Sequence, residues 1–181
     1  MALFFITGNS GTGKSTLYFA LKERGFEAYD TDIDGFAKWH NDETGFIHPK
    51  SSVKPEHRTP EFISTHSWKV VRSEIEDLVV KAESHPVFLC GVVSSVDQIQ
   101  DLFRLSFALV VDDDTLSHRL ATRPFANSWG KSPHERQATL SRQRQFNEAY
   151  KEAGHTMIDA TLPVKKVVDL VISYAEEREL Q

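Results

Sequence analysis

Short apolar runs recur along the chain, separated by stretches in which apolar residues follow a helical spacing. Runs of this length are typical of buried parallel strands, because both faces of such strands are covered. The alternation of the two patterns predicts a succession of strands and helices around a parallel sheet, which is an α/β fold. The five expected strands cover residues 2–7, 26–30, 86–90, 107–112 and 155–159.

Helix start signals accompany the second pattern. Thr59 precedes Pro60, which places an N-cap residue before a proline at the first helical position. The segments that begin at Ser95 and Ser132 match capping boxes, and Pro163 opens a last segment with apolar residues on one side. We expect helices at 16–24, 61–84, 95–104, 115–122, 133–152 and 163–179.

Two stretches do not follow the alternation. Residues 35–58 are polar and aromatic and contain Gly45, Pro49 and Pro55, and residues 123–132 are mostly polar or small. Long irregular segments inside a compact domain are often binding loops or lids, and ordinary surface loops have the same composition. Both interpretations stay open at this point.

The composition is that of an ordinary folded protein, with 40% hydrophobic and 26% charged residues. A length of 181 residues predicts one domain, 1–181, with a proper core. The net charge of −5 argues against a broad surface for nucleic acid or membrane, although it leaves room for a local basic patch. No run approaches the ~20 apolar residues of a membrane span.

The single cysteine, Cys90, lies in an apolar run and cannot form an internal disulfide. A signal peptide is not expected, because the first predicted strand begins at residue 2 and a functional motif follows at once. These features predict a cytoplasmic protein. The eight histidines show no spacing typical of metal ligands.

A glycine-rich motif follows the first predicted strand and precedes a predicted helix. It fits G-x-x-x-x-G-K-[ST], a loop whose glycines let consecutive backbone N–H groups surround phosphates at a helix N-terminus. Lys14 supplies a charge for the β- and γ-phosphates, and the Ser15 hydroxyl is placed to bind Mg²⁺. We therefore predict that ATP and Mg²⁺ are bound. The residues expected at the nucleotide are Gly8, Asn9, Ser10, Gly11, Thr12, Gly13, Lys14, Ser15 and Thr16.

The loop, the small size and the alternating strands resemble the small-molecule branch of the P-loop kinases. Nucleoside monophosphate, shikimate and gluconate kinases belong to that branch. Asp30-Thr31-Asp32, at the end of the second strand, is similar to the D-x-D that shikimate kinases carry there. The resemblance covers nearly the whole chain in architecture. In sequence it is specific only at 8–16, at 30–32 and, more weakly, at 119–131.

The resemblance implies a three-layer α/β/α P-loop NTPase fold with a five-stranded parallel sheet in the order 2-3-1-4-5. It also implies an acceptor-binding region at 33–84 and a lid at 123–132. The other partner of such a protein, besides ATP, is a small-molecule phosphate acceptor. Neither a membrane nor a nucleic acid is an expected partner.

Catalytic and metal-binding roles follow from the same resemblance. Asp32 would contact the acceptor hydroxyl and take its proton, and Asp30 would hold Mg²⁺ or its water shell. Both also fit turn-forming residues at a strand end. Arg119 and Arg123 lie four apart on one helix face that enters the lid. Together with Lys14 they would bind the nucleotide and stabilise the transferring phosphoryl group, unless they belong to a solvated basic face.

Acceptor binding is expected from Arg58, Arg72 and Gly91. An arginine in this region can bind a carboxylate or phosphate of the acceptor with two hydrogen bonds, and it can equally serve solubility. Gly91 follows the third strand and would let a substrate approach the backbone closely. Aromatic residues provide a stacking wall for a ring-shaped acceptor or, alternatively, a local core, and these are Phe36, Trp39, His40 and Trp68.

The chain departs from its relatives after the third strand. Shikimate kinases carry a glycine triplet there, and this chain has only Gly91, which puts shikimate in doubt as the acceptor. Many P-loop enzymes place an Asp at this strand end to hold Mg²⁺, and this chain has none, which leaves Asp30 as the metal partner. Asp112-Asp113-Asp114 is interpreted as a strand end followed by a helix cap.

Three functions fit these features. The first is a kinase that transfers the γ-phosphate of Mg·ATP to a small-molecule hydroxyl or phosphate. The second keeps the fold and takes a nucleoside or nucleoside monophosphate as acceptor, which the aromatic residues between 36 and 68 favour. The third is an ATP-binding regulatory module with weak catalysis, which the missing strand-three Asp motivates.

Overall fold

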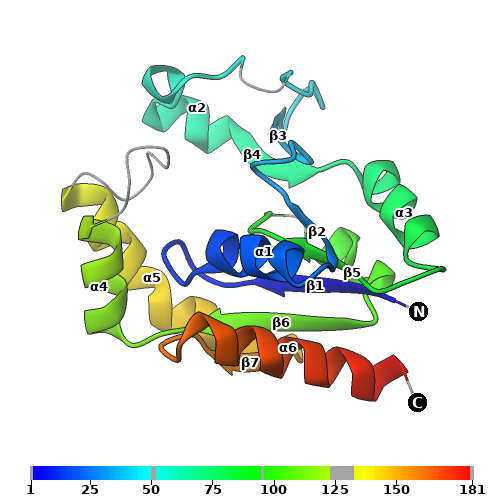
Figure 1. The fold of residues 1–181 in the computed structure, drawn as a ribbon. Coiled ribbons are helices and arrows are strands. Elements are labelled where there is room, and N and C mark those ends of the chain that lie inside the picture. Colours follow the sequence, from blue (N-terminus) through cyan, green and yellow to red (C-terminus); the bar gives the residue numbers. More distant parts are fainter. Residues whose placement is uncertain (1, 50–51, 95, 123–132, 180–181) are drawn as a thin grey trace.

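A five-stranded parallel sheet forms the centre of the molecule (Figure 1). The computed structural model describes residues 2–49, 52–94, 96–122 and 133–179. The strands are β1 (Leu3–Thr7), β2 (Glu27–Asp30), β5 (Val87–Cys90), β6 (Leu105–Val110) and β7 (Thr156–Asp159). They lie in the order β2-β5-β1-β6-β7.

The strand order agrees with the predicted one when only the strands of this sheet are counted along the chain. β2, β5, β1, β6 and β7 are then the second, third, first, fourth and fifth strands. The labels run higher because a separate two-stranded sheet, which the sequence did not predict, contributes β3 (Ala37–Asn41) and β4 (His66–Val70). All five residues of β1 are buried, as expected for a central parallel strand covered on both faces.

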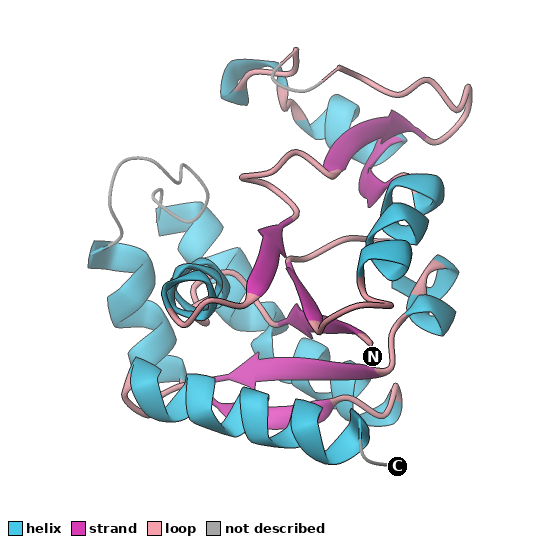
Figure 2. Ribbon diagram, turned by 45° about the vertical axis from the view of Figure 1, so that its right-hand side comes forward, coloured by secondary structure: helices cyan, strands magenta, loops and turns pink. Residues whose placement is uncertain are grey.

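Helices cover both faces of the sheet and give three layers (Figure 2). On one face, Phe4 and Ile6 of β1 pack with residues of α1 (Lys14–Glu23), α4 (Asp113–Thr122) and α6 (Val164–Glu179). On the other face, Leu3 and Phe5 pack with α3 (Arg72–Lys81) and with the small sheet. The alternation of side chains along β1 therefore supplies both cores.

The predicted helix 61–84 is wrong in its middle. The chain forms α2 (Pro60–Thr65), then β4 (His66–Val70), and only then α3 (Arg72–Lys81). β4 pairs antiparallel with β3, inside the stretch 35–58 that was expected to be irregular, and it places Trp68 opposite Trp39. A cross-strand pair of large aromatic rings stabilises a sheet, and this non-local contact outweighs the local helical pattern.

The predicted helix at 95–104 is also wrong. The described part of this stretch forms two short 3₁₀ turns, Val96–Gln98 and Gln100–Leu102. A third 3₁₀ turn, Pro55–His57, precedes α2. The remaining helices agree with prediction within a few residues, and α5 spans Pro133–Glu152 as expected.

Two predicted helix caps are confirmed. The Thr59 hydroxyl accepts a hydrogen bond from the backbone N–H of Phe62 at 3.2 Å, at the start of α2. At the start of α4, the Asp112 carboxylate accepts hydrogen bonds from the backbone N–H and the hydroxyl of Thr115, at 2.7 and 2.8 Å. A cap does follow the strand as interpreted, but it is Asp112, because α4 begins at Asp113 and not at the expected residue 115. No helix among the described residues is long and apolar enough to cross a membrane.

Candidate active site

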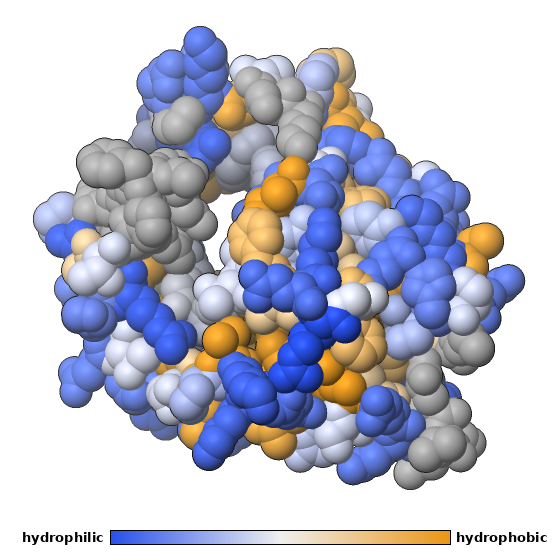
Figure 3. All heavy atoms as spheres, in the orientation of Figure 1, coloured by the Kyte–Doolittle hydropathy of each residue, from blue (hydrophilic) through white to orange (hydrophobic). Residues whose placement is uncertain are grey.

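The glycine-rich loop joins β1 to α1 at the carboxyl edge of the sheet (Figure 1). The surface is hollowed above this loop, between the main body of the molecule and the part that carries α2, β3 and β4 (Figure 3). In open α/β sheets, ligands bind at the carboxyl ends of the strands, so the loop and the neighbouring strand ends form the candidate site.

The conformation of the loop requires glycine at two closely packed positions. Gly8 and Gly11 have φ angles of 143° and 95°, which L side chains rarely adopt. A Cβ on Gly8 would lie 2.5 Å from the Leu109 carbonyl oxygen, and a Cβ on Gly11 would lie 2.8 Å from Leu116 Cδ1. The loop thus packs directly against β6 and α4, and the glycines permit that approach.

Side chains inside the loop hold its shape. Asn9 is buried, donates from Nδ2 to the Thr139 carbonyl oxygen of α5 at 3.1 Å, and accepts from the Ser10 N–H at 2.8 Å. The buried Thr12 hydroxyl donates to the Asn9 carbonyl oxygen at 2.9 Å. These two side chains therefore shape the loop, and Thr16 lies exposed in the first turn of α1.

Lys14 lies across the loop. Its ammonium group donates to the carbonyl oxygens of Gly8 and Asn9 at 2.7 and 3.0 Å. The positive charge is therefore held over the loop that precedes α1. An ammonium group at this place can bind the phosphates of a nucleotide as a compact point charge.

Two oxygen ligands suited to Mg²⁺ lie next to Lys14 in the fold. The Ser15 hydroxyl donates to Oδ2 of Asp30 at 3.1 Å. Asp30 is buried, and its Oδ1 accepts the backbone N–H groups of Asp32 and Ile33 at 2.9 and 3.0 Å. No group of three or more His, Cys, Asp or Glu suited to a metal occurs among the described residues. A pair of oxygen ligands fits Mg²⁺, which usually keeps waters and substrate phosphates as further ligands.

Asp32 lies beside this pair, at the end of β2. Its Oδ1 accepts a hydrogen bond from the indole N–H of Trp68 at 3.0 Å and one from the Thr31 hydroxyl at 3.3 Å. Asp32 is exposed as a residue. The atoms around its carboxylate nevertheless desolvate it and raise its pKa, and the negative charge of Asp30 raises the pKa further. The bond from Trp68 and the charge of Lys14 act in the opposite direction. A raised pKa makes a carboxylate a stronger base.

Arg119, which the sequence analysis expected at the nucleotide, lies against the phosphate loop. Its guanidinium group donates to the Thr12 carbonyl oxygen at 3.2 Å and to the Ala160 carbonyl oxygen, after β7, at 2.8 Å. It therefore connects α4 to the loop and to the segment that follows the last strand. Arg123 and the expected lid at 123–132 lie outside the described residues.

Arg72 is a correction. Its guanidinium group donates to both oxygens of Asp101 at 2.8 and 2.6 Å, to Glu76 at 2.9 Å and to the Gln98 carbonyl oxygen at 2.6 Å. These bonds raise the pKa of Arg72 and leave the group committed to α3 and the turns after β5. The guanidinium group of Arg72 is therefore occupied by residues of this protein and is not available to bind the acceptor.

Arg58 shows a different situation. It is half-buried, and its Nε is buried without a hydrogen-bond partner among the described residues. A guanidinium N–H group in this state has capacity for an anionic oxygen. Arg58 therefore stays a candidate acceptor ligand.

Gly91 is the second correction. A Cβ at this position would lie 2.0 Å from the Thr31 hydroxyl and 2.7 Å from Thr31 Cβ, and Thr31 is fully buried. The space beside Gly91 is therefore filled by the neighbouring side chain and is not open to a substrate. The glycine is explained by the close approach of the ends of β2 and β5.

Replacing Gly91 by Ala is expected to destabilise the protein by about 3 kcal/mol, the upper part of the range for overpacking a core. No positive φ contributes, because Gly91 is not among the glycines with that conformation. Thermal unfolding would measure a drop of about 2–4 °C for each kcal/mol. In a Thr31→Gly background, Gly91→Ala should lower the free energy of unfolding much less, because the added methyl group then fills the space left by the Thr31 side chain. Additive costs in the double variant would refute this packing account.

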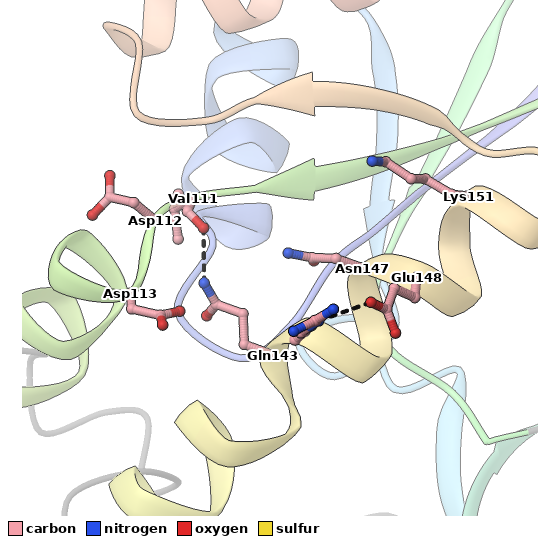
Figure 4. A pocket seen from close by; sticks show the side chains of 8 residues that line it. Val111, Asp112, Asp113, Gln143, Asn147, Glu148 and Lys151 are labelled. Carbon is pink, nitrogen blue, oxygen red and sulfur yellow. Dashed lines mark hydrogen bonds and ion pairs between the residues drawn. The ribbon is translucent and has the colours of Figure 1, made fainter.

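A separate pocket of about 430 Å³ lies between the start of α4 and α5 (Figure 4). None of the predicted site residues lines it. Two of its charged groups pair with each other, Arg144 with Glu148 at 2.9 Å, and Gln143 donates to the Val111 carbonyl oxygen at 2.8 Å. We therefore place the candidate site at the phosphate loop and not in this pocket.

The contact that sequence reasoning missed is the one between Trp68 and Asp32. Trp68 was expected within a helix, as a member of a stacking wall. The signal that could have revealed β4 is the run His66-Ser-Trp-Lys-Val70, which has an aromatic residue at its centre and a β-branched residue at its end. Trp39 and Trp68 do pack together, with ring centres 5.2 Å apart, and Trp39 also packs on Phe62 at 5.3 Å.

Comparison with solved structures identifies the fold. A shikimate kinase from Acinetobacter baumannii, solved with shikimate, has a TM-score of 0.60 at 14% identity, over 100% of this chain and 96% of that chain. A deoxyadenosine kinase from M. mycoides, solved with dATP, has a TM-score of 0.54 at 15% identity, over 97% and 100%. A sugar kinase from Janibacter sp. HTCC2649 has a TM-score of 0.55 at 14% identity, over 96% and 94%.

No model of a protein family matches this chain, and no curated protein matches it either. The likeness to the three kinases therefore concerns the fold, at low sequence identity, and it confirms the predicted resemblance at that level. The substrates after which these three kinases are named differ in chemical class. The fold alone does not select an acceptor.

Proposed function

We propose that this chain is a kinase that transfers the γ-phosphate of Mg·ATP to a hydroxyl or phosphate group of a small molecule. One observation carries the proposal. Lys14, the Ser15–Asp30 pair and Asp32 meet at the carboxyl edge of the sheet, beside a glycine-rich loop that opens α1. A charge for the phosphates, oxygen ligands for Mg²⁺ and a carboxylate base are the parts that phosphoryl transfer requires.

The donor is held by the loop N–H groups and by Lys14, and Arg119 borders the nucleotide from α4. Ser15 and Asp30 hold Mg²⁺, which supplies charge neutralisation at the phosphates when it is bound. The lid expected at 123–132, with Arg123, stays a prediction from the sequence, since these residues lie outside those that the structure describes. The single domain 1–181 acts in the cytoplasm, in keeping with its lone buried cysteine.

Asp32 acts on the acceptor. Its carboxylate accepts the proton of the acceptor hydroxyl while the hydroxyl oxygen attacks the γ-phosphorus. The bond between the γ-phosphorus and the β,γ-bridging oxygen breaks, and ADP leaves with that oxygen. The raised pKa of Asp32 supports this role, because a stronger base takes the proton more readily. The region 33–84, with Arg58, binds the rest of the acceptor.

A nucleoside or nucleoside monophosphate is the second candidate acceptor. On the β3–β4 hairpin, Trp68 donates to Asp32 and packs on Trp39, and this pair of rings favours an acceptor with a flat ring. Aromatic side chains bind such rings by offset stacking. A sugar or hydroxy acid would use hydrogen bonds and Arg58 instead.

ADP release from Mg·ATP, measured across hydroxy acids, sugars, nucleosides and nucleoside monophosphates, tests the proposal. One class of acceptor is expected to raise turnover well above the hydrolysis seen without acceptor. Parallel reactions with Mg·GTP identify the donor, and a Lys14→Ala variant purified in the same way reports contaminating kinases. Tight binding of Mg·ATP without any stimulation by acceptors would contradict a kinase and favour an ATP-binding regulatory module.

A further inference from the structure

Trp68 is held both by the small β3–β4 sheet and by the main body of the molecule, the two parts that border the site. Its backbone lies in β4, where its ring packs on Trp39 of β3. Its carbonyl oxygen accepts the N–H of Ser94, in the segment after β5, at 2.9 Å. The side chain also packs against the core on the α3 face of the main sheet. The indole therefore has little freedom to move relative to the end of β2.

The indole N–H is directed at one oxygen of Asp32. It donates to Oδ1 at 3.0 Å, and the Thr31 hydroxyl donates to the same oxygen at 3.3 Å. No described residue donates to Oδ2. The backbone at this position is held as well, because the Asp32 N–H donates to Asp30 Oδ1 at 2.9 Å.

This asymmetry determines which oxygen is available. The terminal torsion of an aspartate is broad and nearly two-fold, so an unconstrained carboxylate presents either oxygen over a range of angles. A general base acts well only when its accepting oxygen is held within hydrogen-bond reach of the proton. A rigid N–H donor on Oδ1 removes that freedom and leaves Oδ2 as the accepting atom.

We propose that Trp68 is a positioning residue for phosphoryl transfer, whose indole N–H holds Oδ1 of Asp32 so that Oδ2 meets the acceptor hydroxyl. The inference rests on the proposed kinase function and deepens it. It gives the β3–β4 hairpin a role in orienting the base, in addition to any surface that it offers to the acceptor. No proton passes through Trp68, since the indole only donates a hydrogen bond.

Trp68→Phe tests the proposal, because phenylalanine keeps an aromatic ring in the hairpin and removes the N–H. We expect kcat to fall by about tenfold, within the range for losing a hydrogen bond to a charged group. KM for ATP should not change. The control is Ser141→Ala, in α5 and outside the region 33–84, which removes an exposed hydroxyl that donates to the Ala138 carbonyl oxygen at 3.0 Å. Its kcat should equal that of the wild type.

A double-variant cycle separates positioning from structural support. In an Asp32→Asn background, Trp68→Phe is expected to lower the residual rate no further, because there is no base left to orient. A tenfold loss in both backgrounds, or an unchanged kcat in the single variant, would overturn the proposal. An inactive wild type would instead contradict the kinase function itself, so the two failures are distinguishable.

The contact is also measurable without catalysis. In ¹⁵N-labelled protein, the indole N–H resonance of Trp68 is expected to shift on Asp32→Asn and to stay in place on Ser141→Ala. This measurement leaves Trp68 intact and therefore serves if Trp68→Phe unfolds the hairpin. If the chemical shift of the Trp68 indole N–H does not change on Asp32→Asn, the contact is absent in solution and the proposal is wrong.

Discussion

Replacing Asp32 by Asn is expected to lower kcat for acceptor phosphorylation by about 10²–10⁴-fold, the usual contribution of a general base. The amide has nearly the same shape as the carboxylate but cannot take the proton. The Kd of Mg·ATP should stay near that of the wild type, because Asp30, Ser15 and Lys14 remain. Steady-state ADP release and a nucleotide-binding titration measure the two quantities.

Asp112→Asn is the matched control for this change. Asp112 also follows a strand of the parallel sheet, but its carboxylate caps α4 by accepting from Thr115. Asparagine caps helices as well as aspartate does, so stability and turnover should both persist. Full activity in Asp32→Asn would show that another group accepts the proton, or that the acceptor reacts without a base.

Lys14→Ala is expected to lower turnover by about 10²–10³-fold, comparable to the loss of a preorganised donor at the developing charge. The ammonium group lies over the loop, bonded to the Gly8 and Asn9 carbonyl oxygens, and would exchange these partners for phosphate oxygens. Affinity for Mg·ATP should fall as well, because the charge contributes to the bound state before transfer. Initial rates and calorimetric titration measure the two effects.

The matched control removes another lysine from the same helix. Lys22 lies two turns further along α1 and donates to the Tyr18 hydroxyl at 3.3 Å, on the surface of the helix. Lys22→Ala should therefore leave both turnover and nucleotide affinity unchanged. If Lys14→Ala binds Mg·ATP and turns it over at the wild-type rate, the loop does not hold the reacting phosphates in the proposed way.

Local signals were sufficient for the phosphate loop and the main sheet. Gly8, Gly11 and Lys14 belong to one continuous motif between an apolar run that forms β1 and a helical pattern that forms α1. The strand order came from the resemblance, and the sheet confirms it. The caps at Thr59 and Asp112 depend on neighbours within three residues, so their partners could be predicted as well.

The remaining features depend on contacts between distant parts of the chain. β4 forms because Trp68 finds Trp39, 29 positions earlier, and a helical reading of 61–84 contains no sign of that partner. Arg72 was assigned to an acceptor because its residue type fits one, and only the fold reveals Asp101 within reach. Gly91 was assigned to a substrate for the same reason, before Thr31 was seen to fill the space.

The packing of the phosphate loop has a thermodynamic consequence. Gly11 fits against Leu116 of α4, and Asn9 is bonded to Thr139 of α5, so the loop keeps its shape only while both helices are docked. A ligand that binds only this shape adds its binding free energy to the docking of α4 and α5. Nucleotide affinity and the local unfolding of these helices are therefore linked equilibria. A substitution of a core residue in α4 that does not contact the ligand would therefore lower nucleotide affinity before it unfolds the whole protein.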